Sequence, residues 1–338
     1  MDNTVLEIKN LKTYFFTRSG VVKAVDGVSF GLRKGESLCL VGESGCGKTT
    51  AALAVLRLVD SPPGRIIDGE ILYHGEDLLR CSSERLRQIR GNRIAMIFQD
   101  PQSSLNPVFT VGDQIAEQIK LHLRLKHKPA IERTLHLMEQ VGIPQARERM
   151  RDYPHQFSGG MKQRVMIAAA LSCDPEILIA DEPTTALDTT IKAQILEIFR
   201  DLKQKRNMSI LFITHDLGTV AGIADRIVVM YGGRLAEAGT ALDIFDQPKH
   251  PYTLGLINCL PNISTRKDRL TPIPGMIPSL IDPPGGCIFH PRCQKQMTIC
   301  SQEVPPGVVI SGEHIVTCHL YSPSTPPQDS IEGIENAK

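Results

Sequence analysis

Gly42-Glu-Ser-Gly-Cys-Gly-Lys48-Thr49 matches the pattern GxxxxGK(S/T), in which a glycine-rich loop wraps a nucleotide's phosphates in backbone amides. The glycines let the backbone adopt φ angles, and approach a phosphate, in ways that a Cβ would forbid. Lys48 supplies a cation to the β and γ oxygens, and the Thr49 hydroxyl completes a Mg²⁺ coordination sphere. The predicted phosphate-binding residues are Gly42, Glu43, Ser44, Gly45, Cys46, Gly47, Lys48, Thr49 and Thr50.

The residues on both sides of this loop favour a phosphate site over a structural glycine turn. Residues 37–41 form an apolar run typical of a buried strand, and residues 50–56 have the composition of a helix. A helix that starts directly after the loop points its N-terminal amides at the phosphate. Strand, loop and helix in this order predict a nucleotide-binding core.

The composition of the chain excludes several classes of protein. Its 338 residues include 38 basic and 37 acidic side chains, a formal charge of +1, so no global field indicates nucleic-acid binding. The N-terminus lacks the pattern of a signal peptide, and no apolar run reaches the length of a membrane span. We therefore predict a cytoplasmic protein whose link to a membrane is made through a partner.

The distribution of apolar residues predicts an α/β fold. Residues 5–9, 21–25 and 28–32 read as short strands broken by Gly20 and Gly27, which indicates a small N-terminal antiparallel sheet. From about 103 to 172 the apolar spacing is helical. The later apolar strands at 176–180, 209–213 and 227–230 alternate with helices. This pattern predicts a parallel, doubly wound core sheet with a helical insertion.

The composition changes after Pro248. Prolines recur between Pro261 and Pro284, and they disfavour regular helices and central strands. We predict a loop-rich extension at 251–320. Residues 321–338, rich in Pro, Ser and acids, are predicted to be a disordered tail.

Two adjacent carboxylates end one of the predicted core strands. Asp181, at the end of a parallel strand beside the phosphate loop, can hold Mg²⁺ through water. The next residue, Glu182, can then polarise an attacking water. Many buried strands end in acids, so it is the combination with the phosphate loop that indicates a hydrolase.

Phe157-Ser-Gly-Gly-Met-Lys-Gln-Arg164 resembles the signature of the ATP-binding-cassette (ABC) ATPases, although it begins Phe-Ser-Gly-Gly-Met rather than the usual Leu-Ser-Gly-Gly-Gln. Gln99, the run Thr185-Ala-Leu-Asp188 and His215 stand in the order and spacing of that family's Q-loop, D-loop and switch histidine. The resemblance implies a RecA-like core within an ATPase domain at 4–250.

The same resemblance assigns roles to these residues. Ser158, Gly159 and Gly160 would close on ATP held by a partner subunit in a head-to-tail dimer, and Asp188 would contact that subunit. Gln99 would contact Mg²⁺ and the attacking water, and His215 the γ-phosphate. For stacking on adenine, Tyr14, Phe15 and Phe16 are the candidates, and the family pattern favours Phe15.

Three further stretches resemble the dipeptide/oligopeptide (peptide/nickel) importers: 99–107, 153–164 and His250-Pro-Tyr-Thr253. This branch implies membrane permease subunits, an extracytoplasmic substrate-binding protein, and a second, related ATPase subunit, with a homodimer as the alternative. Loop 103–107 would lie in the cleft that receives the permease. Import of nickel or another solute, or a soluble non-transport ABC ATPase, are the alternative functions.

Four cysteines crowd into the extension: Cys287, Cys293, Cys300 and Cys318. In a reducing compartment such a set fits metal ligation better than disulfides. The wide spacing suits a bulky [4Fe-4S] cluster, and the resemblance to a branch whose members carry one supports it, with Zn²⁺ or free or disulfide-paired thiols as alternatives. We predict a structural role for this metal, so that replacing Cys293 with Ser would loosen the extension and leave nucleotide binding intact.

Overall fold

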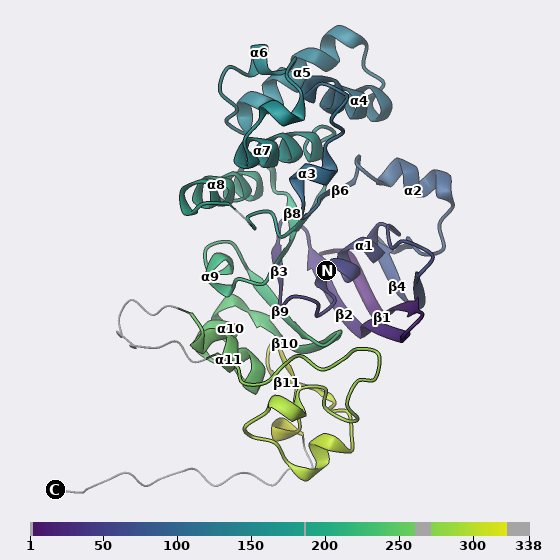
Figure 1. Cartoon of the computed structure of the whole chain (residues 1–338), viewed down its shortest axis with the longest axis vertical. Helices are drawn as coiled ribbons and strands as arrows, with labels where there is room; N and C mark the ends of the chain where they lie inside the picture. The colour runs from purple at the N-terminus through teal and green to yellow at the C-terminus, as the bar shows by residue number, and fades with distance from the viewer. Residues whose placement is uncertain (1–2, 186, 261–271, 323–338) are drawn as a thin grey trace, which may run out of the picture.

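The computed structural model describes residues 3–185, 187–260 and 272–322, and two β-sheets organise these residues. The N-terminal sheet and the core sheet lie side by side, with a helical region at one end and the C-terminal extension at the other (Figure 1). Pro261, Ala186 and residues 323–338 of the predicted tail lie outside the described residues.

The N-terminal sheet is antiparallel, as predicted, with the strand order β2-β1-β4-β5. Its strands are β1 (Thr4–Thr17), β2 (Gly20–Arg33), β4 (Gly64–Tyr73) and β5 (Glu76–Asp77). The prediction of separate strands at 21–25 and 28–32 is wrong, because both belong to β2. Gly27, at φ 83°, sits where the register with β1 shifts, so it forms a bulge instead of ending the strand.

The core sheet has the strand order β11-β12-β10-β9-β3-β8-β7-β6. Strands β3 (Ser37–Val41), β6 (Ile94–Ile97), β7 (Ile177–Asp181), β8 (Ser209–Thr214) and β9 (Arg226–Tyr231) are parallel. Strands β10 (Arg234–Thr240), β11 (Gly307–Ser311) and β12 (His314–Thr317) add an antiparallel edge. The sheet is therefore mixed, with a parallel centre where the sequence predicted one.

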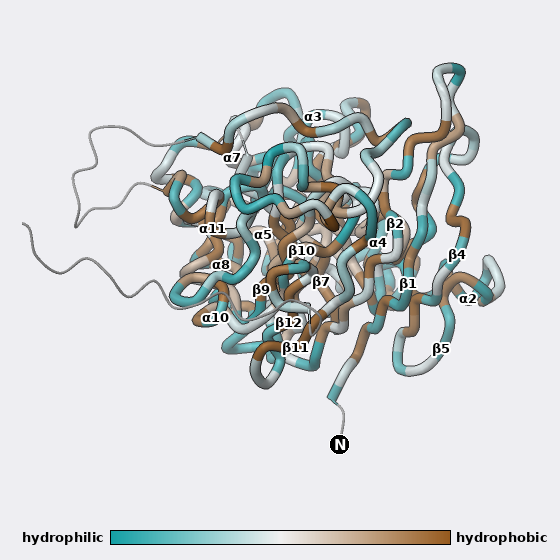
Figure 2. The backbone as a smooth tube through the Cα atoms, turned by 90° about the horizontal axis from the view of Figure 1, so that it is seen from below, coloured by the Kyte–Doolittle hydropathy of each residue, from teal (hydrophilic) through white to brown (hydrophobic). Residues whose placement is uncertain are grey.

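Alternate residues of β3 pack on opposite faces of the core sheet. Leu38 and Leu40 join the apolar cluster shared with the N-terminal sheet, whereas Cys39 and Val41 join the cluster under the helices. Both faces are covered, which explains the uninterrupted apolar sequence of the strand. Figure 2 shows β7, β9 and β10 in the middle of the molecule and β1, β2 and β4 grouped on one side.

The helices mark out the predicted helical insertion. Helices α3 to α7 gather at one end of the molecule, beyond β6 (Figure 1). The helices are α1 (Lys48–Val55), α2 (Ser83–Ile89), α3 (Pro101–Ser104), α4 (Val111–Leu123), α5 (His127–Gln140), α6 (Ala146–Arg149), α7 (Gly159–Ala170), α8 (Thr189–Arg206), α9 (Leu217–Val220), α10 (Ala241–Asp246) and α11 (Pro251–Asn258). Within the described residues, no helix is both long and apolar enough to cross a membrane.

The extension is more regular than its prolines suggested. Helix α11 starts at Pro251, at the N-terminal position where proline's missing N–H is not needed, and His250 caps it. Strands β11 and β12 form a hairpin that continues the core sheet, with Glu237 of β10 opposite Val316 of β12. A regular helix and a hairpin therefore lie on either side of the proline-rich part of the extension that was predicted to be loop-rich.

A buried carboxylate joins the hairpin to the core. Glu237 is fully buried and accepts hydrogen bonds from the backbone N–H groups of Lys249 (2.7 Å) and His250 (2.9 Å), and His314 Nε2 lies 2.6 Å from its Oε1. Because a carboxylate out of water needs donors on its oxygens, these contacts fix β12 and the start of α11 to β10.

Replacing His314 with Ala is expected to lower the free energy of unfolding by about 2 kcal/mol, because Glu237 stays buried and loses a donor. Urea unfolding of the whole chain would measure the change. His74→Ala is the matched control, since its ion pair with Glu176 involves a half-exposed imidazole and should contribute less than about 1 kcal/mol. Equal losses in the two variants would contradict the structural role of Glu237.

Candidate functional site

The predicted phosphate loop joins β3 to α1, as the sequence indicated. Gly45 (φ 80°) and Gly47 (φ 98°) adopt left-handed backbone angles that favour glycine. Packing adds a second reason for glycine, since a Cβ on Gly42 would lie 2.2 Å from the Met230 carbonyl oxygen, and one on Gly47 would lie 2.1 Å from that of Ala24. The loop is thus held between β9 and β2.

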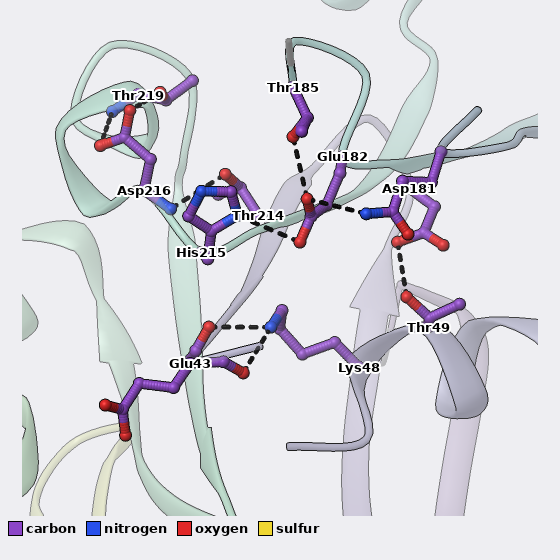
Figure 3. A network of polar contacts seen from close by, with 12 residues as sticks. Glu43, Lys48, Thr49, Asp181, Glu182, Thr185, Thr214, His215, Asp216 and Thr219 are labelled. Carbon is purple, nitrogen blue, oxygen red and sulfur yellow. Dashed lines mark hydrogen bonds and ion pairs between the residues drawn. The ribbon is translucent and has the colours of Figure 1, made fainter. Parts of the chain in front are cut away.

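The Lys48 ammonium group closes the loop on itself. Its Nζ donates to the carbonyl oxygens of Gly42 (2.8 Å) and Glu43 (3.0 Å), and the residue is buried. These contacts hold the cation beside the loop's backbone amides, where an anion would accept from both. Figure 3 shows Lys48 and Thr49 on the same side of the two carboxylates.

Asp181 ends β7 next to the start of α1. The Thr49 hydroxyl donates to Asp181 Oδ1 at 3.1 Å. Burial raises the pKa of Asp181 to about 6, and the neighbouring Glu182 charge adds to the rise. A hydroxyl and a carboxylate that meet in this way are the oxygen ligands that Mg²⁺ prefers, so the two residues fit the predicted magnesium site.

Glu182 lies at the centre of a hydrogen-bonded group. Its Oε2 accepts from Gln99 Nε2 (3.2 Å) and from the Thr185 hydroxyl (2.9 Å), and His215 Nδ1 lies 3.1 Å from its Oε1. In Figure 3 the side chains of His215 and Thr185 point toward it. Three segments far apart in sequence, which carry the predicted site residues Gln99, Glu182 and His215, therefore meet at one carboxylate.

One cavity contains the phosphate loop and the two segments beside it. The side chains of Gln99 and Glu182 form part of its wall. Its lining residues are Phe15, Val22, Ala24, Ser44, Gly45, Gly47, Lys48, Thr49, Thr50, Gln99, Glu182 and Leu280. Of the three aromatic candidates only Phe15 is among them, since Tyr14 donates its hydroxyl to Asp26 (2.7 Å) and Phe16 is exposed beside Arg65.

The signature residues lie elsewhere. Ser158 caps α7 by accepting from Met161 N–H at 3.4 Å, and Ser158 and Gly159 are exposed. None of the lining residues of the nucleotide cavity comes from 158–160. Asp188, also exposed, caps α8 by accepting from Ile191 N–H at 2.9 Å. The predicted second anion site thus lies outside the cavity that contains the chain's own phosphate loop.

The four cysteines of the extension lie near one another without forming disulfides. Burial raises the pKa of Cys318, and the charges of Cys287, Cys293 and Cys300 raise it further, which places all four thiols in one neighbourhood. The predicted metal centre is nevertheless not confirmed. In the part of the chain that the structure describes, no three His, Cys, Asp or Glu side chains are grouped so as to hold a metal ion.

Two residues of the extension that were not predicted as site residues contact the phosphate loop. Tyr252 accepts from Glu43 N–H at 2.9 Å, and Arg292 binds the Glu43 carboxylate through both terminal nitrogens (2.8 and 3.2 Å). The extension therefore contacts the phosphate loop through Glu43. The motif at 250–253 gave a signal for Tyr252, but nothing local relates Arg292 to a residue 249 positions away.

The chain is similar to known transport proteins. Residues 25–185 match the family described as ABC transporter, and residues 236–300 match the C-terminal region of oligopeptide/dipeptide transporters. The dipeptide transport ATP-binding protein DppD of Bacillus subtilis is 50% identical over 94% of each chain. The oligopeptide transport ATP-binding protein AppD of the same organism is 49% identical over 94% of this chain and 97% of its own length.

Solved structures show the same fold. A dimeric ATP-binding cassette in a post-hydrolysis state, bound to ADP and Pi, superposes with a TM-score of 0.63 at 24% identity. The match covers 70% of this chain and 98% of that cassette. The mixed core sheet and antiparallel N-terminal sheet therefore belong to the ATP-binding cassette architecture.

His250 contacts Tyr252, the residue whose hydroxyl accepts from Glu43 of the phosphate loop. The residue is buried, its Nδ1 accepts from Tyr252 N–H at 3.0 Å, and burial lowers its pKa to about 4. From its ordinary pKa of 6.5 down to about 4, the unfolded chain binds a proton that the folded chain does not. Stability therefore falls as the pH falls through this range, by up to about 3 kcal/mol.

His250→Asn is expected to reduce this loss, because asparagine can still cap α11 but does not titrate. Unfolding free energies measured from pH 7 to pH 4 would show a shallower decline than in the unaltered chain. His136→Asn, at an exposed position of α5, should leave the decline unchanged. An unchanged slope in His250→Asn would show that other groups cause the acid sensitivity.

Proposed function

The chain belongs to the ABC transporter family, among the ATP-binding proteins of dipeptide and oligopeptide transport, and from this premise we propose that it is the ATP-hydrolysing subunit of a peptide importer. The observation that carries the proposal is the meeting of Gln99, Glu182 and His215 beside Lys48 and Thr49. This arrangement provides an anion cradle and a base within one cavity.

The residues of the cavity divide the chemistry between them. The loop amides and Lys48 bind the β- and γ-phosphates, and Phe15 stacks on the base. Thr49, Asp181 and Gln99 would hold Mg²⁺, which neutralises charge on the phosphate oxygens. Glu182 accepts the proton of the attacking water, while Gln99 and His215 orient that water and the carboxylate.

The outward-facing signature requires a second cassette. Ser158, Gly159 and Gly160 present a helix N-terminus that suits an anion, yet they do not line the chain's own nucleotide cavity. They would therefore complete the site of a partner, with Asp188 at the same interface. The partner is a second, related ATPase subunit, so that two ATP molecules lie between the subunits. A homodimer is the alternative assembly.

A permease would dock beside the helical region. Val108 and Phe109 follow loop 103–107 and are 70% and 54% exposed, although both are large and apolar. Leu105 of the same loop lines an apolar cavity together with Met96, Ile97, Phe98 and Met166. Gln99 follows Phe98 directly, so a helix of the permease in this cavity would sense the nucleotide site. Such docking makes the chain a peripheral protein of the cytoplasmic face.

The transported solute is recognised elsewhere in such a complex. The names of the related proteins favour peptides over nickel, and the extracytoplasmic substrate-binding protein would select among them through the permease. A soluble, non-transport ABC ATPase is not favoured, because the C-terminal match is to a transporter region. The ATPase domain would comprise 4–250 and the extension 251–320.

The four cysteines would hold a structural [4Fe-4S] cluster. Their thiols share one neighbourhood in a segment made largely of turns and loops. Sulfur ligands are those that iron–sulfur clusters require, and a cluster separates its ligands more widely than a single ion does. A Zn²⁺ ion held by the same four sulfurs is the alternative. Cluster binding would add to the folding energy of the extension.

Glu182→Gln is expected to retain ATP binding and to lower steady ATP hydrolysis at least about 100-fold, because the amide cannot accept the proton. ATP-dependent dimer should accumulate, as measured by size-exclusion chromatography together with phosphate release. Glu197→Gln, on the exposed side of α8, is the control and should hydrolyse ATP normally. Unreduced hydrolysis by Glu182→Gln would refute Glu182 as the base.

Cys293→Ser is expected to lose the iron and sulfide that protein purified without oxygen should contain, about four of each per chain for one [4Fe-4S] cluster. Proteolysis should then cut more readily within 272–322. Cys81→Ser, outside the extension, should keep both metal content and protease resistance. Finding one zinc, or no metal, in the unaltered chain would contradict the proposed cluster.

A further inference from the structure

One wall of the nucleotide cavity comes from the C-terminal extension. Leu280 lines this cavity together with Phe15, Val22 and the phosphate loop. The segment that carries it runs from the extension toward the N-terminal sheet (Figure 1). A residue 265 positions after Phe15 thus shares a surface with it.

The cavity has a polar end and an apolar end. Ser44, Lys48, Thr49 and Thr50 mark the phosphate end, where the loop amides converge. The large apolar side chains of the lining are Phe15, Val22 and Leu280. Phe15 and Val22 are cross-strand partners in β1 and β2, and Lys23, the residue after Val22, donates its N–H to the Leu280 carbonyl oxygen at 3.0 Å. These contacts group the three side chains at the apolar end.

Close packing fixes the position of the Leu280 segment on β2. The next residue, Ile281, lies against Gly20, where an added Cβ would be 2.5 Å from Ile281 Cγ2. Gly20 therefore allows the extension to approach the sheet more closely than a larger residue would. Together with the backbone hydrogen bond to Lys23, this contact sets the distance between Leu280 and the cavity.

Arg292 fixes the other end of the same segment. Its Nε donates to the Pro274 carbonyl oxygen (2.9 Å) and its Nη2 to that of Ile273 (3.2 Å). The same guanidinium binds the Glu43 carboxylate of the phosphate loop, and its side chain is 4% exposed. Residues 273–280 are thus held between the phosphate loop and β2.

We propose that Leu280 forms an apolar wall of the base-binding end, so that the extension contacts the nucleotide base directly. The proposal rests on the function proposed above and adds a base-contacting residue to that site. A purine presents two flat, weakly polar faces, and an aromatic ring covers only one of them. An aliphatic side chain beside Phe15 removes further base surface from water and strengthens binding of nucleosides over bare phosphates.

The test compares ATP with inorganic tripolyphosphate, which carries the phosphates without a base. Calorimetric titration of the full chain in Mg²⁺ would give both affinities. Leu280→Ala is expected to weaken ATP binding about five- to tenfold and to leave tripolyphosphate binding unchanged. The KM for ATP should rise with kcat preserved, because the lost contact is the same in the ground and transition states.

Two further variants isolate the effect of the base contact. Leu280→Phe keeps an apolar face and should retain ATP affinity. Met276→Ala alters an 89% exposed side chain of the same segment and should change neither affinity. Equal ATP affinity in Leu280→Ala and the unaltered chain would overturn the proposal, as would parallel weakening of ATP and tripolyphosphate, which would indicate a displaced phosphate loop.

Failure of the unaltered chain to bind ATP would overturn the proposed ATPase function, and this inference with it. Normal binding and hydrolysis by the unaltered chain, with no response to Leu280→Ala, would overturn this inference alone. The two failures are therefore distinguishable within one set of titrations.

Discussion

The backbone of the phosphate loop lies in close contact with the backbones of β9 and β2, and the arrangement of the rest of the structure depends on this contact. Gly42 lies against the Met230 carbonyl of β9, and Gly47 against the Ala24 carbonyl of β2. Gly233 N–H donates to the Cys46 carbonyl oxygen (3.0 Å), which ties the β9–β10 turn to the loop. The core sheet and the N-terminal sheet therefore meet at the loop, and its shape depends on both.

Two negatively charged side chains are held next to the phosphate loop. Asp181 and Glu182 are adjacent and buried, and burial raises the pKa of Asp181. Glu182 has a φ of 45°, a left-handed angle that costs a residue with a Cβ about 1–3 kcal/mol. The cost is offset because this angle directs its carboxylate to Gln99, Thr185 and His215. The backbone angle of Glu182 and the burial of both acids thus hold two carboxylates beside the proposed site of Mg²⁺ and ATP. Mg²⁺ would attract these carboxylates, and the phosphates of ATP would repel them.

The sequence predicted the parts of this site that local patterns encode. Glycine spacing identified the loop around Lys48, and an apolar run ending in two acids identified Asp181 and Glu182. The course of β2 was mispredicted because Gly27 can either end a strand or form a bulge, and only pairing with β1 decides between them. The contact between Arg292 and Glu43 was missed because no local pattern relates residues so far apart.

The extension follows the ATPase core in sequence, and buried polar contacts connect the two. Tyr252 and Arg292 hold Glu43, and Glu237 holds the hairpin of the extension through His314. A ligand that binds only the folded arrangement stabilises every segment it depends on, and the linkage is reciprocal. The contacts of Tyr252 and Arg292 with Glu43 connect the extension to the phosphate loop in this way.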